Sequence, residues 1–140
     1  MRAVGFAGSI AGAALCLVLW AAPAVAHHAF AAEFDVNQPV KLRGTVTKVE
    51  WINPHAWLHI DVKGADGSTE RWEIELGAPN GLLRRGWRKD SVPVGTEVLV
   101  EGFRSKNPNH FRANGREANL PDGRKMFLGS EGTGTPEFAK

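Results

Sequence analysis

Cysteine is nearly absent from this sequence, and its single occurrence, Cys16, lies in the apolar segment near the amino terminus. A chain with one cysteine forms no internal disulfide, so its stability must come from packing. The sequence also contains no CxxC pair, no HExxH motif and no methionine-rich run. These absences exclude the usual patterns of zinc site and a thioether site for Cu(I).

Charge of one sign is not concentrated anywhere in the chain. The 17 lysines and arginines are interspersed with 15 aspartates and glutamates. A nucleic-acid groove or an anionic-membrane surface needs clustered basic residues. We therefore expect no nucleic acid among the partners.

Signatures of catalysis are absent too. The sequence has no Ser-His-Asp order, no nucleophile elbow and no phosphate loop. Glu73 and Glu75 alternate along one segment that also holds Arg71. We interpret them as a charge-balanced strand surface, not as the paired carboxylates of a glycosidase. The sequence favours a binding protein over an enzyme.

The first 26 residues have the order of a secretory signal peptide. Met1-Arg2 gives a short positive region, Ile10–Trp20 an apolar region, and Ala24-Val25-Ala26 a small-x-small cleavage site. The apolar stretch is shorter than the ~20 residues that span a bilayer. We expect cleavage after Ala26, export to the bacterial periplasm or beyond it, and no stable membrane insertion of the mature chain.

Apolar residues at alternate positions predict the strands of the mature chain. Val40, Leu42 and Val46 share one face, and Val49 and Trp51 have the opposite parity, which indicates a β-bulge near Thr47-Lys48. The inward faces of the next two strands are expected to hold Ala56, Leu58, Ile60 and Val62, and then Trp72, Ile74 and Leu76. Their outward faces are expected to hold Trp57, His59 and Asp61, and then Arg71, Glu73 and Glu75.

The second half of the mature chain predicts one short helix and the remaining strands. A helical turn is expected around Leu82–Arg85. One strand is expected to begin at Val94, another to run through Arg116–Leu120, and a short final one to cover Lys125–Leu128. This order predicts a mainly all-β fold, an OB-like Greek-key barrel of five to six strands, with a small β-sandwich as the alternative. The expected organisation is a signal peptide (1–26), an N-terminal arm (27–38), the barrel domain (39–128) and a disordered tail (129–140).

Three stretches together identify a family resemblance. They are His27–Asp35 directly after the leader, Gly44–Trp51 followed by Asn53-Pro54-His55, and Pro79–Trp87. With these stretches the chain resembles the small exported bacterial proteins grouped as domain-of-unknown-function family 6152. The resemblance implies a periplasmic location and an OB-like barrel, and it implies no established activity.

Cleavage after Ala26 would create the most suggestive chemical feature of the chain. His27 would then carry an α-amine beside its imidazole, and the two groups can chelate one metal ion. Nitrogen donors in this arrangement suit Cu(II), and the pKa of an α-amine, about 8, offers little proton competition near neutrality. One more imidazole would complete the site. We expect His28 or His55 in this role, and His59 and His110 are the other histidines of the chain.

A frayed, solvated amino terminus without a functional metal is the competing interpretation. The chain would then be a metal-free module that binds a small ligand, a glycan or a protein. Trp57, with Asn53 and Asp61 near it in sequence, is the expected ligand surface, because aromatic rings on OB faces stack sugars or bases. A copper oxidase or oxygenase is a third alternative, but no substrate surface is recognisable in the sequence.

The cleavage site is tested by mass spectrometry of the exported protein. We expect His27 as the first residue of the mature chain, because Ala24-Val25-Ala26 is a small-x-small site that follows the apolar region and directly precedes the polar His27-His28. A mature chain that keeps Val25, or that begins after His28, would eliminate the α-amine of His27 as a ligand.

Overall fold

The computed structural model describes residues 30–129, and these residues form a mainly antiparallel β-sheet of six strands with little helix. The expected signal peptide, His27, His28 and nearly all of the expected tail lie outside the described residues. Between residues 30 and 129 no helix is both long and apolar enough to cross a membrane. The elements in chain order are α1 (Phe30–Glu33), β1 (Phe34–Glu50), β2 (Trp57–Lys63), β3 (Thr69–Glu75), α2 (Pro79–Arg84), β4 (Glu97–Ser105), β5 (Arg112–Asn119) and β6 (Lys125–Phe127).

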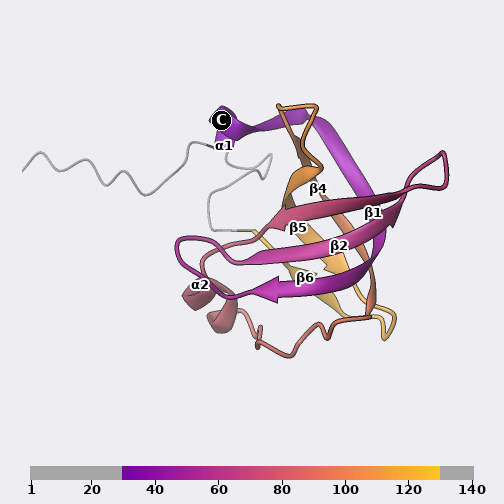
Figure 1. Cartoon of the computed structure of the whole chain (residues 1–140). Helices are drawn as coiled ribbons and strands as arrows, with labels where there is room; N and C mark the ends of the chain where they lie inside the picture. Colours follow the sequence, from indigo (N-terminus) through magenta and orange to yellow (C-terminus); the bar gives the residue numbers. More distant parts are fainter. Residues whose placement is uncertain (1–29, 130–140) are drawn as a thin grey trace, which may run out of the picture.

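The strands pair in a circuit that returns to its starting point. The sheet order is β3-β2-β1-β4-β5-β6, and β3 pairs in addition with β5. The β3–β5 pairing is parallel, and the other pairings of the described strands are antiparallel. β1 takes part twice, because Gly44–Glu50 pairs with β2 and Phe34–Thr45 pairs with β4. Figure 1 shows β1 as the long strand that runs from α1 and bends around the other strands.

β1 begins earlier than the alternation predicts. The structure starts this strand at Phe34, well before Val40, so part of the segment assigned to the N-terminal arm is strand. Phe34 is buried and pairs with Ser105, and the register shifts before Pro39 pairs with Phe103. The alternation missed this part because an irregular register hides the period-2 pattern.

The predicted bulge and the predicted core faces are confirmed. The β1–β2 register shifts between Val46 and Lys48, where the parity of the apolar residues changes. Leu58 and Ile60 on β2 and Ile74 on β3 are all fully buried. The core consists mainly of these inward side chains together with those of β4 and the β3–β4 connection.

Glu75 is the exception to the predicted strand faces. We expected it on the outward surface with Arg71 and Glu73, but only 8% of it is exposed. The cause is the parallel pairing, in which Glu75 lies opposite Asn114 of β5. This contact joins residues that are far apart in sequence, so the alternation within β3 could not reveal it.

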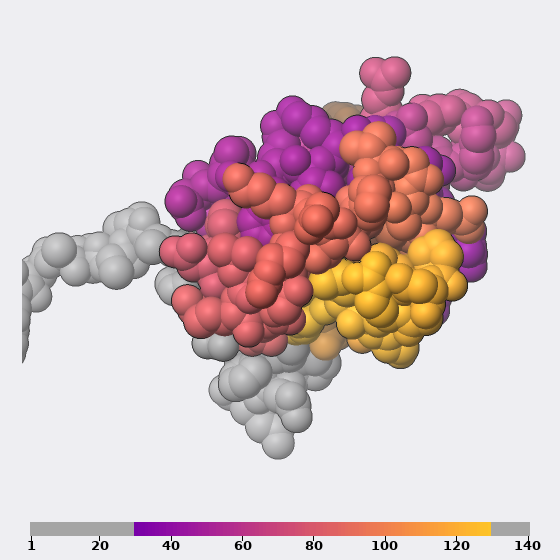
Figure 2. All heavy atoms as spheres, turned by 90° about the horizontal axis from the view of Figure 1, so that it is seen from below, coloured from indigo at the N-terminus to yellow at the C-terminus, as the bar shows by residue number. Residues whose placement is uncertain are grey.

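The connection from β3 to β4 covers one end of the sheet. The predicted helical turn is confirmed as α2, whose Leu82 is buried, and Gly86 ends it with φ 90°. The buried Trp87 donates its indole N–H to Phe127 O at 2.8 Å, and Arg124 donates to Ser91 O at 3.3 Å. Figure 2 accordingly shows this connection against the β5–β6 segment in yellow.

Shortening buried aliphatic side chains tests the assigned core. Ile60→Ala and Ile74→Ala should each lower the free energy of unfolding by ~2–5 kcal/mol, because each leaves a cavity among fully buried neighbours. Lys63→Ala, at an exposed position of β2, should change it by less than ~0.5 kcal/mol. Urea unfolding of the three variants measures the difference, and equal losses at buried and exposed positions would contradict the assigned strand faces.

Candidate functional site

A buried polar cluster lies where β2, β3 and β5 meet. We call it the His55 cluster, and it consists of His55, Glu75 and Asn114. The Asn114 amide donates to Glu75 Oε1 at 3.3 Å, and His55 Nδ1 lies 3.9 Å from the same oxygen. Asn114 is 6% exposed, and its Oδ1 is buried without a hydrogen-bond partner. Buried polar atoms normally have a hydrogen-bond partner. The free Asn114 Oδ1 therefore lets the cluster accept one more hydrogen bond.

The backbone around His55 fixes which ring nitrogen carries the proton. Ala56 N donates to Gly77 O and Leu76 N donates to Ala56 O, so His55 stands at the end of the β2–β3 ladder. His55 Nδ1 is 3.2 Å from Leu76 O. A carbonyl oxygen only accepts, so Nδ1 must be the donor and the neutral ring keeps its lone pair on Nε2. This is also the tautomer in which an imidazole can bind a metal through Nε2.

Arg112 connects the amino-terminal segment to the sheet. Its guanidinium contacts Glu33 of α1 at 2.9 Å and Glu73 of β3 at 2.6 Å. Burial alone would lower the pKa of Arg112, but the hydrogen bonds and charges of Glu73 and Glu33 raise it above its usual value. Lys106 adds a backbone hydrogen bond from its N to Glu33 O at 2.9 Å. Hence α1 is held against β3 and the β4–β5 connection by several polar contacts.

Aromatic packing holds the same segment on its other side. The Phe30 ring lies 5.7 Å from the Phe34 ring and 5.6 Å from the Phe103 ring, the second pair edge to face. Such pairs add to the stabilisation from buried area. The chain just after His27 and His28 is therefore fixed in place from Phe30 onward.

The three residues expected to form a ligand surface are not brought together. Trp57 is half-buried, and the guanidinium of Arg112 lies 5.0 Å from the centre of its ring. Asn53 lies in the loop before β2, whereas Asp61 pairs with Arg71 toward the other end of that strand. Because a β-strand rises about 3.3 Å per residue, Trp57 and Asp61 are roughly 13 Å apart along β2.

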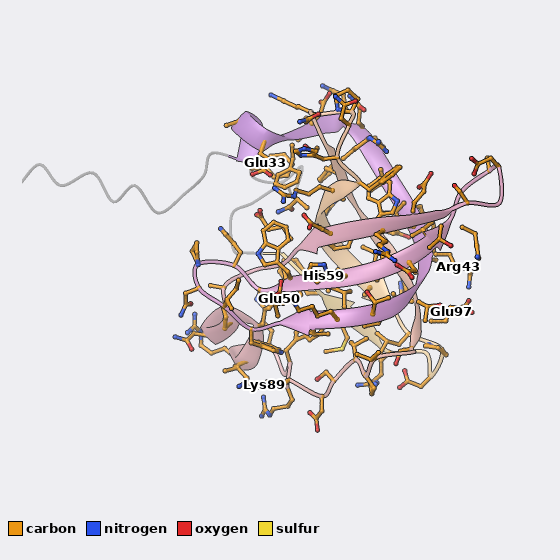
Figure 3. The ribbon with its side chains drawn as sticks, in the orientation of Figure 1. Glu33, Arg43, Glu50, His59, Lys89 and Glu97 are labelled. Carbon is orange, nitrogen blue, oxygen red and sulfur yellow. The ribbon has the colours of Figure 1, made fainter. Side chains whose placement is uncertain are left out.

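His59 has a partner that the sequence did not suggest. We expected it on a solvated face, but its Nε2 lies 2.9 Å from Glu50 Oε2, and both side chains are partly buried. Contacts from Lys48 and then His59 hold the pKa of the Glu50 carboxyl below its usual range. Figure 3 shows Glu50 and His59 side by side, with Arg43 and Glu97 at the opposite end of the sheet. The bulge after Val46 shifts the register, so Glu50 pairs with Trp57 and comes beside His59.

A surface hollow of about 470 Å³ lies beside this pair. We call it the β2–β3 groove, because its floor is formed by these two strands and its far wall by the β4–β5 connection. The sequence did not point to this surface, since its parts come from three separate stretches. The available signal in the sequence was an aromatic residue followed by a basic one, Phe111-Arg112, where β5 begins. The polar and aromatic residues that line it include His59, Arg71, Glu73, Asn109, His110 and Phe111.

One family model matches this chain, over residues 14–114, and its description is family of unknown function (DUF6152). The chain belongs to this family. The resemblance predicted from the sequence is thereby confirmed. No curated protein and no solved structure matches the chain. The activity of this DUF6152 protein must therefore be argued from its own side chains.

Within residues 30–129 no group of three or more His, Cys, Asp or Glu side chains is arranged to hold a metal ion. His27 and His28 lie outside these residues, so the expected copper site can be followed in the DUF6152 protein only through His55. A metal that uses His55 would need ligands from the amino-terminal segment.

Replacing Arg112 tests how α1 is held. Arg112→Gln should lower the free energy of unfolding by roughly 1–3 kcal/mol, because it removes charged hydrogen bonds to two carboxylates at a partly buried position. It should also speed amide hydrogen exchange in Phe30–Phe34. The control is Arg43→Gln, whose exposed ion pair with Glu97 should be worth at most ~1 kcal/mol. Unchanged exchange in Arg112→Gln would show that the aromatic packing and the Lys106 backbone hydrogen bond hold the segment without Arg112.

Proposed function

We propose that this DUF6152 protein is an exported periplasmic binding module with an OB-like barrel, and that it binds Cu(II) through His27 of the mature chain together with His55. The observation behind the copper site is the hydrogen bond from His55 Nδ1 to Leu76 O, which leaves Nε2 as a ligand. Export and cleavage after Ala26 are part of the proposal, because the α-amine of His27 exists only after that cleavage.

The strand pairings support an OB-like barrel. A circuit of five strands, β1-β2-β3-β5-β4, returns to β1 with one parallel pairing between β3 and β5. The short α2 lies between β3 and β4, and β1 is long and bulged. These are the features by which the sequence predicted this fold.

The position of α1 supports the use of His27. Glu33 contacts Arg112, which lies opposite Glu73 in the β3–β5 register, and the next pair on the same face is Glu75 with Asn114. Along the strands, the Glu73–Arg112 pair and the Glu75–Asn114 pair are roughly 7 Å apart. His27 precedes Phe30, where α1 begins, by three residues, and an extended chain of that length spans up to about 10 Å. The proposed site requires these three residues to run from α1 toward the level of Glu75, which lies beside His55.

The donor set fits Cu(II). In the proposed site the α-amine and the imidazole of His27 chelate the ion, His55 Nε2 supplies a third nitrogen, and His28 offers a further imidazole. Nitrogen donors in a T-shaped or square arrangement favour Cu(II), which also has the highest affinity in the divalent series. Glu75 lies 3.9 Å from His55 Nδ1, and a carboxylate beside the non-ligating nitrogen makes an imidazole a better ligand.

A metal-free binding module is the second candidate function. The β2–β3 groove favours it, since it is an open, polar and aromatic hollow that needs no metal. Trp57, Asn53 and Asp61 were the expected ligand surface, but the groove shares none of these residues.

The copper site is tested by Cu(II) titration of the correctly cleaved protein. A version whose His27 α-amine is acetylated should bind Cu(II) at least about a hundredfold more weakly, because the amide nitrogen that results is a poor ligand at neutral pH. His55→Ala should also weaken binding, by about tenfold or more. His110→Ala is the matched control, because it also removes one imidazole but from the exposed β4–β5 connection, and it should bind like the parent protein.

A synthetic peptide covering His27–Asp35 separates a folded site from a flexible one. It contains the local ligands without His55, so the protein should bind Cu(II) more tightly than the peptide does. Equal affinities, together with no effect of His55→Ala, would eliminate the folded site and favour the metal-free module.

A further inference from the structure

Phe111 forms a fixed aromatic wall in the β2–β3 groove. Its ring is held against the buried Trp72, with ring centres 5.5 Å apart, and its backbone O accepts a hydrogen bond from Glu73 N at 2.9 Å. Phe111 nevertheless remains 42% exposed. A large apolar ring that is rigidly placed and still open to solvent suits a stacking partner with an apolar face.

The groove has one cation that the described protein leaves unpaired. Arg112 is balanced by Glu33 and Glu73, and His59 is engaged by Glu50. The Arg71 side chain is exposed and makes no hydrogen bond or ion pair with the side chains of residues 30–129, although Asp61 is its cross-strand neighbour on β2. The carboxylate in the groove, Glu73, already has Arg112 as its partner. The groove therefore favours an anion near Arg71.

Two further polar side chains line the groove. His110 and Asn109 lie on the β4–β5 connection, and both are exposed. Asn109 donates its backbone N–H to Asn107 Oδ1 at 3.0 Å. An imidazole and an amide each offer hydrogen-bond donors and acceptors. This combination of one aromatic face, one guanidinium and several short polar groups matches a hydroxylated ring that carries a single acidic group.

We propose that the β2–β3 groove binds a carboxylate-bearing pyranose, that is, a uronic acid unit of a saccharide. The C–H face of the sugar stacks on Phe111, its carboxylate pairs with Arg71, and its hydroxyls bond to His110 and Asn109. A volume of about 470 Å³ lies within the usual range for small-molecule sites. A nucleic acid is disfavoured, because its backbone needs several unpaired cations along one track.

This site is independent of the proposed copper site. Among the described residues, His55 does not line the groove, and none of the groove residues is a ligand in the copper proposal. Saccharide binding should therefore persist in the presence of a chelator, and it should persist in His55→Ala. Loss of copper binding and loss of saccharide binding can be observed separately.

The test is a titration of the mature protein, in EDTA, with a trisaccharide of galacturonic acid and with the matching neutral galactose trisaccharide. Backbone NMR shifts should move around Arg71 and Phe111 with the acidic sugar, and its affinity should exceed that of the neutral sugar. Phe111→Ala and Arg71→Gln should each weaken binding by about tenfold. Arg43→Gln is the control, because it removes an exposed guanidinium near Glu97, away from the groove.

Each variant is first checked to be folded under the conditions of the titration. Arg71→Gln should leave the unfolding midpoint unchanged, whereas Phe111→Ala loses the packing of the ring on Trp72 and should lower it. Equal affinity for the neutral and acidic sugars would overturn the assignment of Arg71 to a carboxylate. Three results would overturn the site itself. They are NMR shift changes confined to other strands, no binding of the acidic trisaccharide at millimolar concentration, and an unaltered affinity of Phe111→Ala for it.

Discussion

The parallel pairing of β3 with β5 is the contact on which the rest of the structure depends. It joins Thr69–Glu75 to Arg112–Asn119 across a long stretch of chain and completes the circuit of strands. Because of this pairing, Glu75 and Asn114 are buried together, and Arg112 lies opposite Glu73. Both candidate sites are built on it, since the His55 cluster uses one level of the pairing and the groove uses the level beside it.

Arg112 turns this backbone contact into a link between three elements. Its guanidinium pairs with carboxylates from α1 and β3 and lies over the ring of Trp57 on β2. Arginine suits this role because its planar group donates several hydrogen bonds while its faces stay open for stacking. Through these contacts the Arg112 side chain holds the amino-terminal segment beside β2, the strand that follows His55.

The proposed copper site would join export to function in a simple way. An unprocessed chain has an amide where the mature chain has the α-amine of His27, so binding would begin only after cleavage. In this proposal His55 is the partner imidazole, and its hydrogen bond to Leu76 O sets its tautomer before a metal binds. Preorganisation of this kind strengthens binding because less freedom is lost when the complex forms. The groove gives the same fold a second, metal-free surface.

The sequence by itself determined the local features: the strands, the bulge after Val46, the short helix α2 and the inward positions of Ile60 and Ile74. Alternation and turn residues report these because they act between near neighbours in the chain. The tertiary structure alone decided the burial of Glu75, the ion pair of His59 with Glu50, and the position of Arg112 over Trp57. Each of these depends on which strands become neighbours, and no periodicity within one strand encodes that choice.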